Sequence, residues 1–184
     1  MLTRLQKDLL LKLARDAVAA HLRGEPAAAA ADGVLEELQS LRAGVFISLH
    51  RGEDLRGCIG NIEPQTPLPE TVKAMAVAAA CSDPRFEPVS ADELEQLRLE
   101  ISVITPLRAL VSLEEFRLGV HGLMVRLGKR HGLLLPQVAR GRQWDVYTFL
   151  RHVCRKANLP EDAWQNPKAE LFYFDAEVFS DDLS

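Results

Sequence analysis

The sequence predicts an α+β fold: a largely antiparallel mixed sheet flanked by helices, with room for a smaller second lobe. Two observations carry this prediction. Strand-like segments mostly follow one another along the chain with helical segments between them, an order typical of α+β domains. Their apolar residues alternate in the strand-like segments and recur every three to four residues in the helical ones. The 184 residues can form a sizeable core, and we expect one domain over residues 1–184, helical over 1–43 and sheet-containing over 44–184.

Capping signals and helical periodicity define the predicted helices. Thr3 and Gln6 form a capping-box pair at the start of the first helix, and Gly24 ends it. Pro67 stands where its missing N–H does least harm, at the start of another helix. The predicted helical ranges are 4–22, 35–41, 66–81, 90–97 and 146–157.

The predicted strands begin with a hairpin. Residues 44–50 and 55–60 read as strands joined by turn residues at 51–54, which predicts an antiparallel pair. The register stays open, since a shift of one residue decides whether Cys58 shares a face with Ser48 or with Ile47. Further strands are expected at 98–105, 119–127, 132–135 and 171–179.

Charge and cysteine usage exclude several classes of protein. The net charge is −4 and the pI is about 5.8, whereas a general nucleic-acid binder usually has a strong basic excess. No apolar run is long enough to span a membrane, and residues 1–8 lack the apolar run of a signal peptide. The three cysteines, at 58, 81 and 154, fit free thiols in the reducing cytoplasm better than a disulfide framework. We therefore expect a cytoplasmic protein.

The stretch Leu55–Gly60, read LRGCIG, places a cation and a thiol two residues apart on a strand. Alternate side chains of a strand share a face, so Arg56 and Cys58 are expected to point the same way. A guanidinium near a thiol favours the thiolate, whose ordinary pKa is about 8.5. Gly57 and Gly60 indicate a bulge or a close approach by another group. The alternative is an edge strand with a buried cysteine and a solvated arginine.

LRGCIG resembles the signature of the AMMECR domain family, whose bacterial and archaeal members are called AmmeMemoRadiSam system protein A. Other stretches resemble the family in the same order: Asp83–Phe86, Leu99–Val103, His121–Leu123, Leu133–Ala139 and Lys156–Leu159. The sequence departs from the family's pattern at Asn158, where glycine is expected. Both residues tolerate the left-handed conformation that ends a helix. The resemblance implies an AMMECR-like fold and no established activity. The family name records an association with Memo-like and radical-SAM proteins, which implies a modification pathway with these as partners.

Cys58 is the best candidate for a nucleophile, and a nucleophilic thiol needs a base or a field to hold it as thiolate. Three histidines are candidate bases: His50, His121 and His131. His121 alternates with apolar residues along its strand, so the alternative is a core histidine whose ring nitrogens are satisfied.

Two carboxylates accompany the thiol as candidates. Glu100 projects from its strand opposite the aliphatic side chains, so it is either solvated or lines a cleft, where Arg56 would be its partner. Asp83 either belongs to the site or simply pairs with Arg85 in its loop, a pairing worth about 0–1 kcal/mol.

These candidates define the predicted site. The catalytic set is Cys58, His121 and Glu100, and the ligand-binding set is Arg56, Gly57, Gly60, Asp83 and Arg85. We expect no metal site, because the cysteines are not closely paired, and no cofactor is evident, since no glycine-rich phosphate loop occurs. Whether the protein is an enzyme stays open. The alternative is a non-catalytic module that captures a peptide or an anionic ligand on the same surface.

Overall fold

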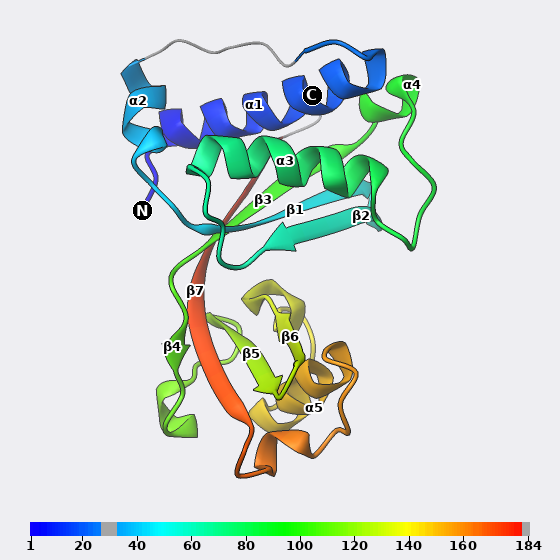
Figure 1. Cartoon of the computed structure of the whole chain (residues 1–184). Helices are drawn as coiled ribbons and strands as arrows, with labels where there is room; N and C mark the ends of the chain where they lie inside the picture. Colours follow the sequence, from blue (N-terminus) through cyan, green and yellow to red (C-terminus); the bar gives the residue numbers. More distant parts are fainter. Residues whose placement is uncertain (27–32, 182–184) are drawn as a thin grey trace. The chain divides into compact units, whose positions relative to one another are not determined.

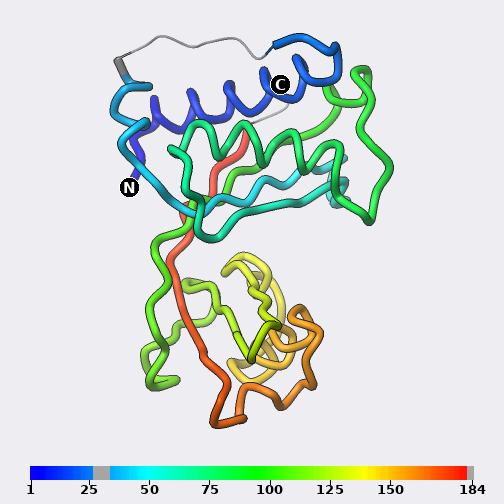
Figure 2. Tube along the Cα trace, in the orientation of Figure 1, coloured from blue at the N-terminus to red at the C-terminus, as the bar shows by residue number. Residues whose placement is uncertain are grey.

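The computed structural model describes residues 1–26 and 33–181, and it confirms the α+β class with antiparallel strands flanked by helices (Figure 1). The chain divides into two compact units, one of Met1–Ile104 with Glu177–Ser184, the other of Thr105–Ala176. The chain can be followed from one unit to the other and back in Figure 2. The division does not coincide with the expected change from a helical to a sheet-containing part between residues 43 and 44. The single domain over residues 1–184 stays a prediction.

The first unit contains a sheet with β1 (Gly44–Arg51) between two antiparallel neighbours. These neighbours are β2 (Asp54–Asn61), at the edge of the sheet, and β3 (Arg98–Ile104). β7 (Glu170–Ser180) follows β3 in the strand order. The predicted hairpin of residues 44–60 is therefore confirmed.

Helices cover one face of this sheet. The longest are α1 (Arg4–Arg23) and α3 (Leu68–Cys81), which pack against each other, and α3 also contacts β1 and β2 (Figure 1). Shorter helices are α2 (Gly33–Gln39) and α4 (Ala91–Leu94). The predicted start of α1 is confirmed, since the Thr3–Gln6 capping box is complete. The core between helices and sheet includes Leu10, Val18, Val45, Ile47, Leu49, Val72, Ala76, Leu99 and Ile101.

Two ion pairs connect α1 to the end of the chain. Lys7 contacts Glu177 on β7, and Arg15 contacts Asp181 just beyond it. The guanidinium of Arg15 also donates to the carbonyls of Leu94 and Leu97. Arg15 therefore holds α1, the α4 segment and the C-terminal strand together.

The second unit has its own antiparallel strands: β4 (Arg108–Ala109), β5 (His121–Leu127), β6 (Arg130–Leu134) and part of β7. The helix α5 (Val146–Lys156) packs on β5 and β6. Three short 3-10 helices complete the unit: η1 (Leu113–Glu115), η2 (Pro136–Ala139) and η3 (Ala163–Gln165). Its core includes Leu123, Val125, Phe149, Leu150, Val153 and Cys154.

The expected left-handed residue after α5 is present, since Asn158 has φ 53°. β4 and η3 were not predicted, because two or three residues carry too little periodicity to mark an element. No helix within residues 1–26 and 33–181 is both long and apolar enough to cross a bilayer.

Candidate functional site

The hairpin register places Cys58 opposite Ser48, and Ser48 in turn lies opposite Glu100 on β3. One face of the sheet therefore carries a row of three polar side chains from three strands. Ile47 and the other aliphatic residues of β1 point to the opposite face, into the core beneath the helices. Of the two registers left open by the sequence, the structure has the one that groups Cys58 with Ser48.

The sulfur of Cys58 has a direct hydrogen-bond donor. The hydroxyl of Ser48, a residue only 8% exposed, lies 3.3 Å from the Cys58 Sγ and donates to it. Cys58 itself is half-buried and its thiol is free. A thiol that is reachable and held by a fixed donor is suited to chemistry or to ligand contact.

Two further titratable groups share this face of the sheet. Glu100 forms an ion pair with Arg98 at 3.6 Å. His50 lies two residues beyond Ser48 on β1, and burial lowers its pKa, with a further lowering by the nearby charge of Arg98. Among the described residues the buried Nε2 of His50 has no hydrogen-bond partner. The row therefore ends beside a buried imidazole nitrogen without a hydrogen-bond partner among the described residues.

The main chain of Cys58 is held by the Asp83–Arg85 ion pair. The Cys58 N–H donates to the Asp83 carboxylate at 2.8 Å, and the Arg85 Nη2 donates to the Cys58 carbonyl at 3.3 Å. Arg85 also donates to Asp83 from its Nε at 2.9 Å and its Nη2 at 2.6 Å. Both polar main-chain groups of the cysteine are thus fixed by one ion pair.

Asp83 is almost fully buried, with 2% of its side chain exposed. Its hydrogen bond with Arg85 holds the pKa of Asp83 far below its usual range, against the opposing effect of burial. The same bond raises the pKa of Arg85, as do the charges of Asp83 and of a Cys58 thiolate. The predicted pairing of Asp83 with Arg85 is therefore present, and it reaches Cys58.

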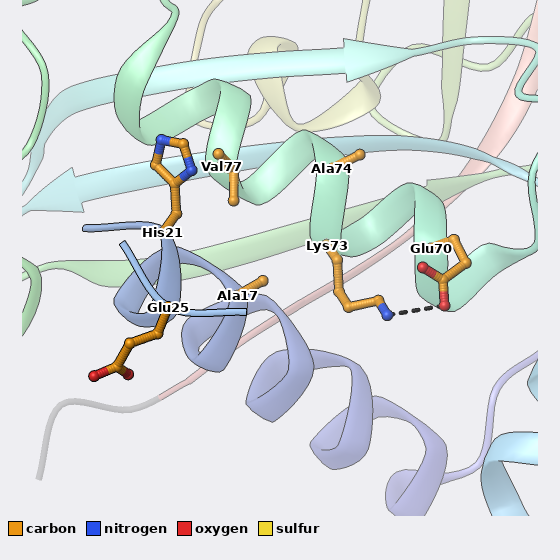
Figure 3. A pocket seen from close by; sticks show the side chains of 7 residues that line it. All are labelled: Ala17, His21, Glu25, Glu70, Lys73, Ala74 and Val77. Atoms are coloured by element: carbon orange, nitrogen blue, oxygen red, sulfur yellow. Dashed lines mark ion pairs between the residues drawn. The ribbon is translucent and has the colours of Figure 1, made fainter. Parts of the chain in front are cut away.

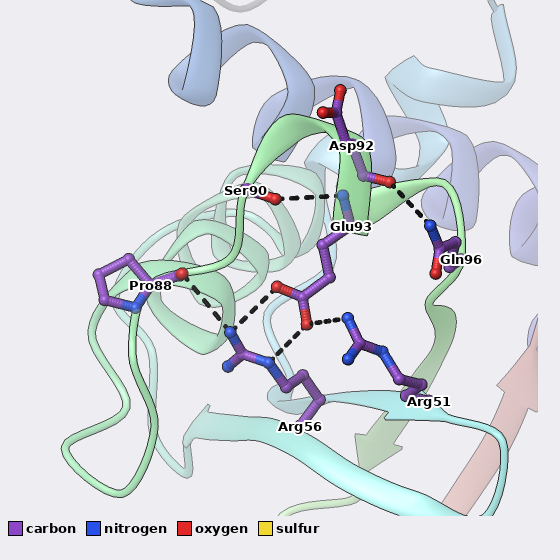
Figure 4. A network of polar contacts seen from close by, with 7 residues as sticks. All are labelled: Arg51, Arg56, Pro88, Ser90, Asp92, Glu93 and Gln96. Carbon is purple, nitrogen blue, oxygen red and sulfur yellow. Dashed lines mark hydrogen bonds and ion pairs between the residues drawn. The ribbon is translucent and has the colours of Figure 1, made fainter.

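The predicted partner of Arg56 is wrong. Its guanidinium contacts Glu93 of α4, not Glu100, with Nε 2.7 Å from Oε1 and Nη2 3.1 Å from Oε2 (Figure 4). Arg51 also reaches this carboxylate, at 2.6 Å. The reason is a β-bulge: Leu49 pairs with Gly57 and His50 with Leu55, so Arg56 is an extra residue and strict alternation with Cys58 fails there.

Gly57 and Gly60 are explained by packing. A Cβ on Gly57 would lie 2.2 Å from the carbonyl oxygen of Ala79 in α3, and one on Gly60 would lie 2.1 Å from the ring of Phe46. Each glycine thus permits the close approach that the sequence indicated. Their predicted contact with a ligand stays a prediction.

His121 belongs to the second unit, where both its ring nitrogens are engaged. Nδ1 accepts from the Arg117 N–H at 3.1 Å, and Nε2 lies 3.7 Å from the Asp175 carboxylate. The ring also contacts Phe116 and Tyr173. Burial lowers its pKa. These contacts match the alternative of a satisfied histidine, and the catalytic role of His121 stays a prediction.

The other two cysteines are less suited to chemistry. Burial raises the pKa of Cys154, which is fully buried in the second core, and burial also raises the pKa of Cys81. In the described part of the chain, no three His, Cys, Asp or Glu side chains are grouped to hold a metal ion.

The candidate set from the sequence lacks two residues of this region. Ser48 joins Cys58 in only one of the two registers that the sequence leaves open. Glu93 stands three residues after Ser90, a spacing that predicts only a helix-capping pair. Its N–H does donate to the Ser90 hydroxyl, but its carboxylate contacts Arg56. No local signal marks a contact between residues 37 positions apart.

A separate hollow of about 400 Å³ lies between α1 and α3. Its lining combines small apolar residues with an ion pair between Lys73 and Glu70 (Figure 3). The lining residues are Ala17, His21, Glu25, Glu70, Lys73, Ala74 and Val77. None of the predicted site residues lines this hollow.

The first unit is thus an α+β unit with a fixed, half-buried cysteine on the edge strand of its sheet. A model of the AMMECR1 family matches residues 11–179, and the chain belongs to this family. A protein of Methanothermobacter thermautotrophicus is 40% identical, over 98% of this chain and 97% of its own length. Protein MK0488 of Methanopyrus kandleri is 38% identical, over 98% and 91%.

A solved structure has the same fold. The uncharacterized protein PH0010 from Pyrococcus horikoshii superposes with a TM-score of 0.92 at 34% identity, covering 98% of this chain and 94% of that one. The resemblance expected from the LRGCIG stretch is therefore confirmed at the level of the family and its fold.

Proposed function

We propose that Cys58 is the functional group of this domain, and that its thiol contacts a small-molecule or protein substrate on the polar face of the first sheet. The observation that carries this proposal is the fixing of Cys58. The buried Asp83 and its partner Arg85 bind both main-chain polar groups of Cys58. The Ser48 hydroxyl donates a hydrogen bond to the sulfur of the same residue. Reactive groups held in one geometry by supporting contacts are typical of catalytic sites.

The cation at Cys58 supports the same proposal. The guanidinium of Arg85 donates to the Cys58 carbonyl at 3.3 Å, and about half of the Arg85 side chain is exposed. An anionic group of a substrate could therefore bind this guanidinium while the substrate contacts the thiol of the same cysteine. Glu100 lies in the same row of polar side chains as Cys58, and we propose that its carboxylate takes part in the chemistry at the thiol.

The second candidate is a non-catalytic module that binds an anionic ligand through Arg85. The half-exposed guanidinium favours it, because only part of this side chain is used by Asp83 and Cys58. The two candidates differ in what they require of the thiol: the first needs the sulfur, and the second does not.

Selective alkylation tests the first candidate. Native protein is treated with iodoacetamide near neutral pH, and the modified cysteines are followed by peptide mapping. We expect Cys58 to react faster than Cys81 and Cys154. If all three react equally slowly, Cys58 is a packing residue and the thiol proposal is wrong.

We further propose that the domain works in the cytoplasm with Memo-like and radical-SAM proteins in a modification pathway. The family membership and the three free cysteines support this. Purified partners from one host would be mixed with wild-type protein and with Cys58→Ser, and complex formation followed by size-exclusion chromatography. A complex with the wild type supports the partnership, and its absence with both partners contradicts it.

A further inference from the structure

The segment of residues 83–93 follows α3 and contacts β2 at two separate places; we call it the edge strap. Its start holds Cys58 through Asp83 and Arg85, and its end holds Arg56 through Glu93. Between them, the Val89 N–H donates to the Ala80 carbonyl at 2.9 Å, and the Val89 side chain is buried. The edge strap is thus fixed along its length.

Glu93, at the end of the edge strap, makes two ion pairs, and the pair with Arg56 is the less exposed of the two. The side chains of Arg56 and Glu93 are 18% and 13% exposed, whereas Arg51, the second cation at Glu93, is 56% exposed. Two hydrogen bonds join Arg56 to the carboxylate, and a third reaches the Pro88 carbonyl at 3.5 Å (Figure 4). This geometry leaves the guanidinium of Arg56 little freedom.

Phe86 links the two ends of the edge strap. Its ring centroid lies 5.9 Å from the guanidinium carbon of Arg56 and 5.3 Å from that of Arg85. Both distances are within the range of cation–π contacts. The contacts therefore run without a break from Glu93 through Arg56, Phe86 and Arg85 to the main chain of Cys58.

From this chain of contacts we infer that Glu93 is a positioning residue for Cys58. By fixing Arg56, it fixes the ring of Phe86 and with it the guanidinium of Arg85 at the Cys58 carbonyl. This inference rests on the proposed function of the Cys58 thiol, because a positioning residue needs a group to position.

The ratio of two alkylation rates measures the charge at the sulfur. Iodoacetate is an anion and iodoacetamide is neutral, so a nearby fixed cation raises the iodoacetate rate relative to the iodoacetamide rate. This ratio is measured for each cysteine of the native, full-length protein by peptide mapping. A residue that contributes only to overall stability would not change it at Cys58 alone.

The test compares Glu93→Gln with a matched control, Asp92→Asn. Both changes remove one negative charge from α4, but the Asp92 carboxylate points away from the arginines (Figure 4). We expect the ratio at Cys58 to fall about threefold in Glu93→Gln, the size of one partly exposed charge contact, and to stay at the wild-type value in Asp92→Asn. Equal ratios in wild type and both variants would overturn the inference.

A second variant keeps the test decisive if Glu93→Gln does not fold. Phe86→Leu retains apolar bulk but removes the ring between the two guanidinium groups, and we expect the same fall in the ratio. An unchanged ratio in this variant would also overturn the inference. A wild-type iodoacetamide rate at Cys58 no faster than at Cys81 and Cys154 would instead contradict the proposed function itself, so the two failures are distinguishable.

Discussion

The hydroxyl of Ser48 donates a hydrogen bond to the sulfur of Cys58 across the β1–β2 hairpin, over 3.3 Å. This pair makes Ser48 the direct support of the thiol on the polar face of the sheet.

Ser48→Ala should slow the alkylation of Cys58 about fivefold, because the sulfur loses a hydrogen bond worth roughly 1 kcal/mol. Ser40→Ala is the control, since Ser40 is exposed and its hydroxyl donates only to the Glu37 carbonyl. Rates at Cys58 are measured by peptide mapping. A Ser48→Ala rate equal to that of the control would show that the hydroxyl does not support the thiol.

Asp83 should make stability depend on acid pH. The pKa of Asp83 is depressed in the folded protein, chiefly by the hydrogen bond with Arg85. The contribution of Asp83 to the free energy of unfolding is therefore complete above the unfolded carboxyl pKa of about 3.9. This contribution is lost as the pH falls below that value. Urea unfolding of wild type and Asp83→Asn, at intervals from pH 7 to pH 3, measures this. The stability advantage of wild type should shrink as the pH falls from about 4 to 3; an advantage constant over this range would contradict the depressed pKa of Asp83.

Gly57→Ala should destabilise the protein more than Gly60→Ala. The new methyl at position 57 meets the main-chain oxygen of Ala79 at 2.2 Å, which can move only with α3, whereas at position 60 it meets the ring of Phe46, a side chain. Overpacking of this kind costs about 1–3 kcal/mol. Thermal melts of both variants compare the two sites, and a larger loss at Gly60 would reverse our account of the close approach.

Arg15→Met should lower the free energy of unfolding by about 1–3 kcal/mol, the range for hydrogen bonds to charged groups. The change leaves Asp181 without its cation and removes two donors from the carbonyls of Leu94 and Leu97. The exposed Lys12, one turn away and paired with Asp16, offers the control Lys12→Met. Equal melting temperatures for the two variants would show that Arg15 does not hold the C-terminal strand.

Local sequence signals were sufficient for most of the fold. Capping residues and apolar periodicity located α1, α3 and α5 within a few residues, because these signals depend on neighbours in the chain. The hairpin was also predicted, since turn residues stand between its two strands. Short elements such as β4 were missed, as they depend on contacts with distant strands.

The site was less predictable, because its geometry depends on one irregularity. A regular strand would place Arg56 and Cys58 on one face, but the bulge gives Arg56 no partner on β1. The guanidinium then reaches Glu93, whose position after Ser90 reads from sequence as a helix cap only. Asp83 and Arg85 were recognisable as a loop pair, whereas their contacts with Cys58 span 25 and 27 residues and have no local signal.

The edge strap also bears on how this protein meets other chains. A strand at the edge of a sheet normally offers its free N–H and C=O groups to any extended segment, which invites strand addition and aggregation. At Cys58 those two groups are already taken by Asp83 and Arg85. An extended peptide can therefore not prolong the sheet at Cys58 unless this ion pair opens first. A partner that contacts this cysteine has to approach its side chain from the polar face, not join the main chain at the edge.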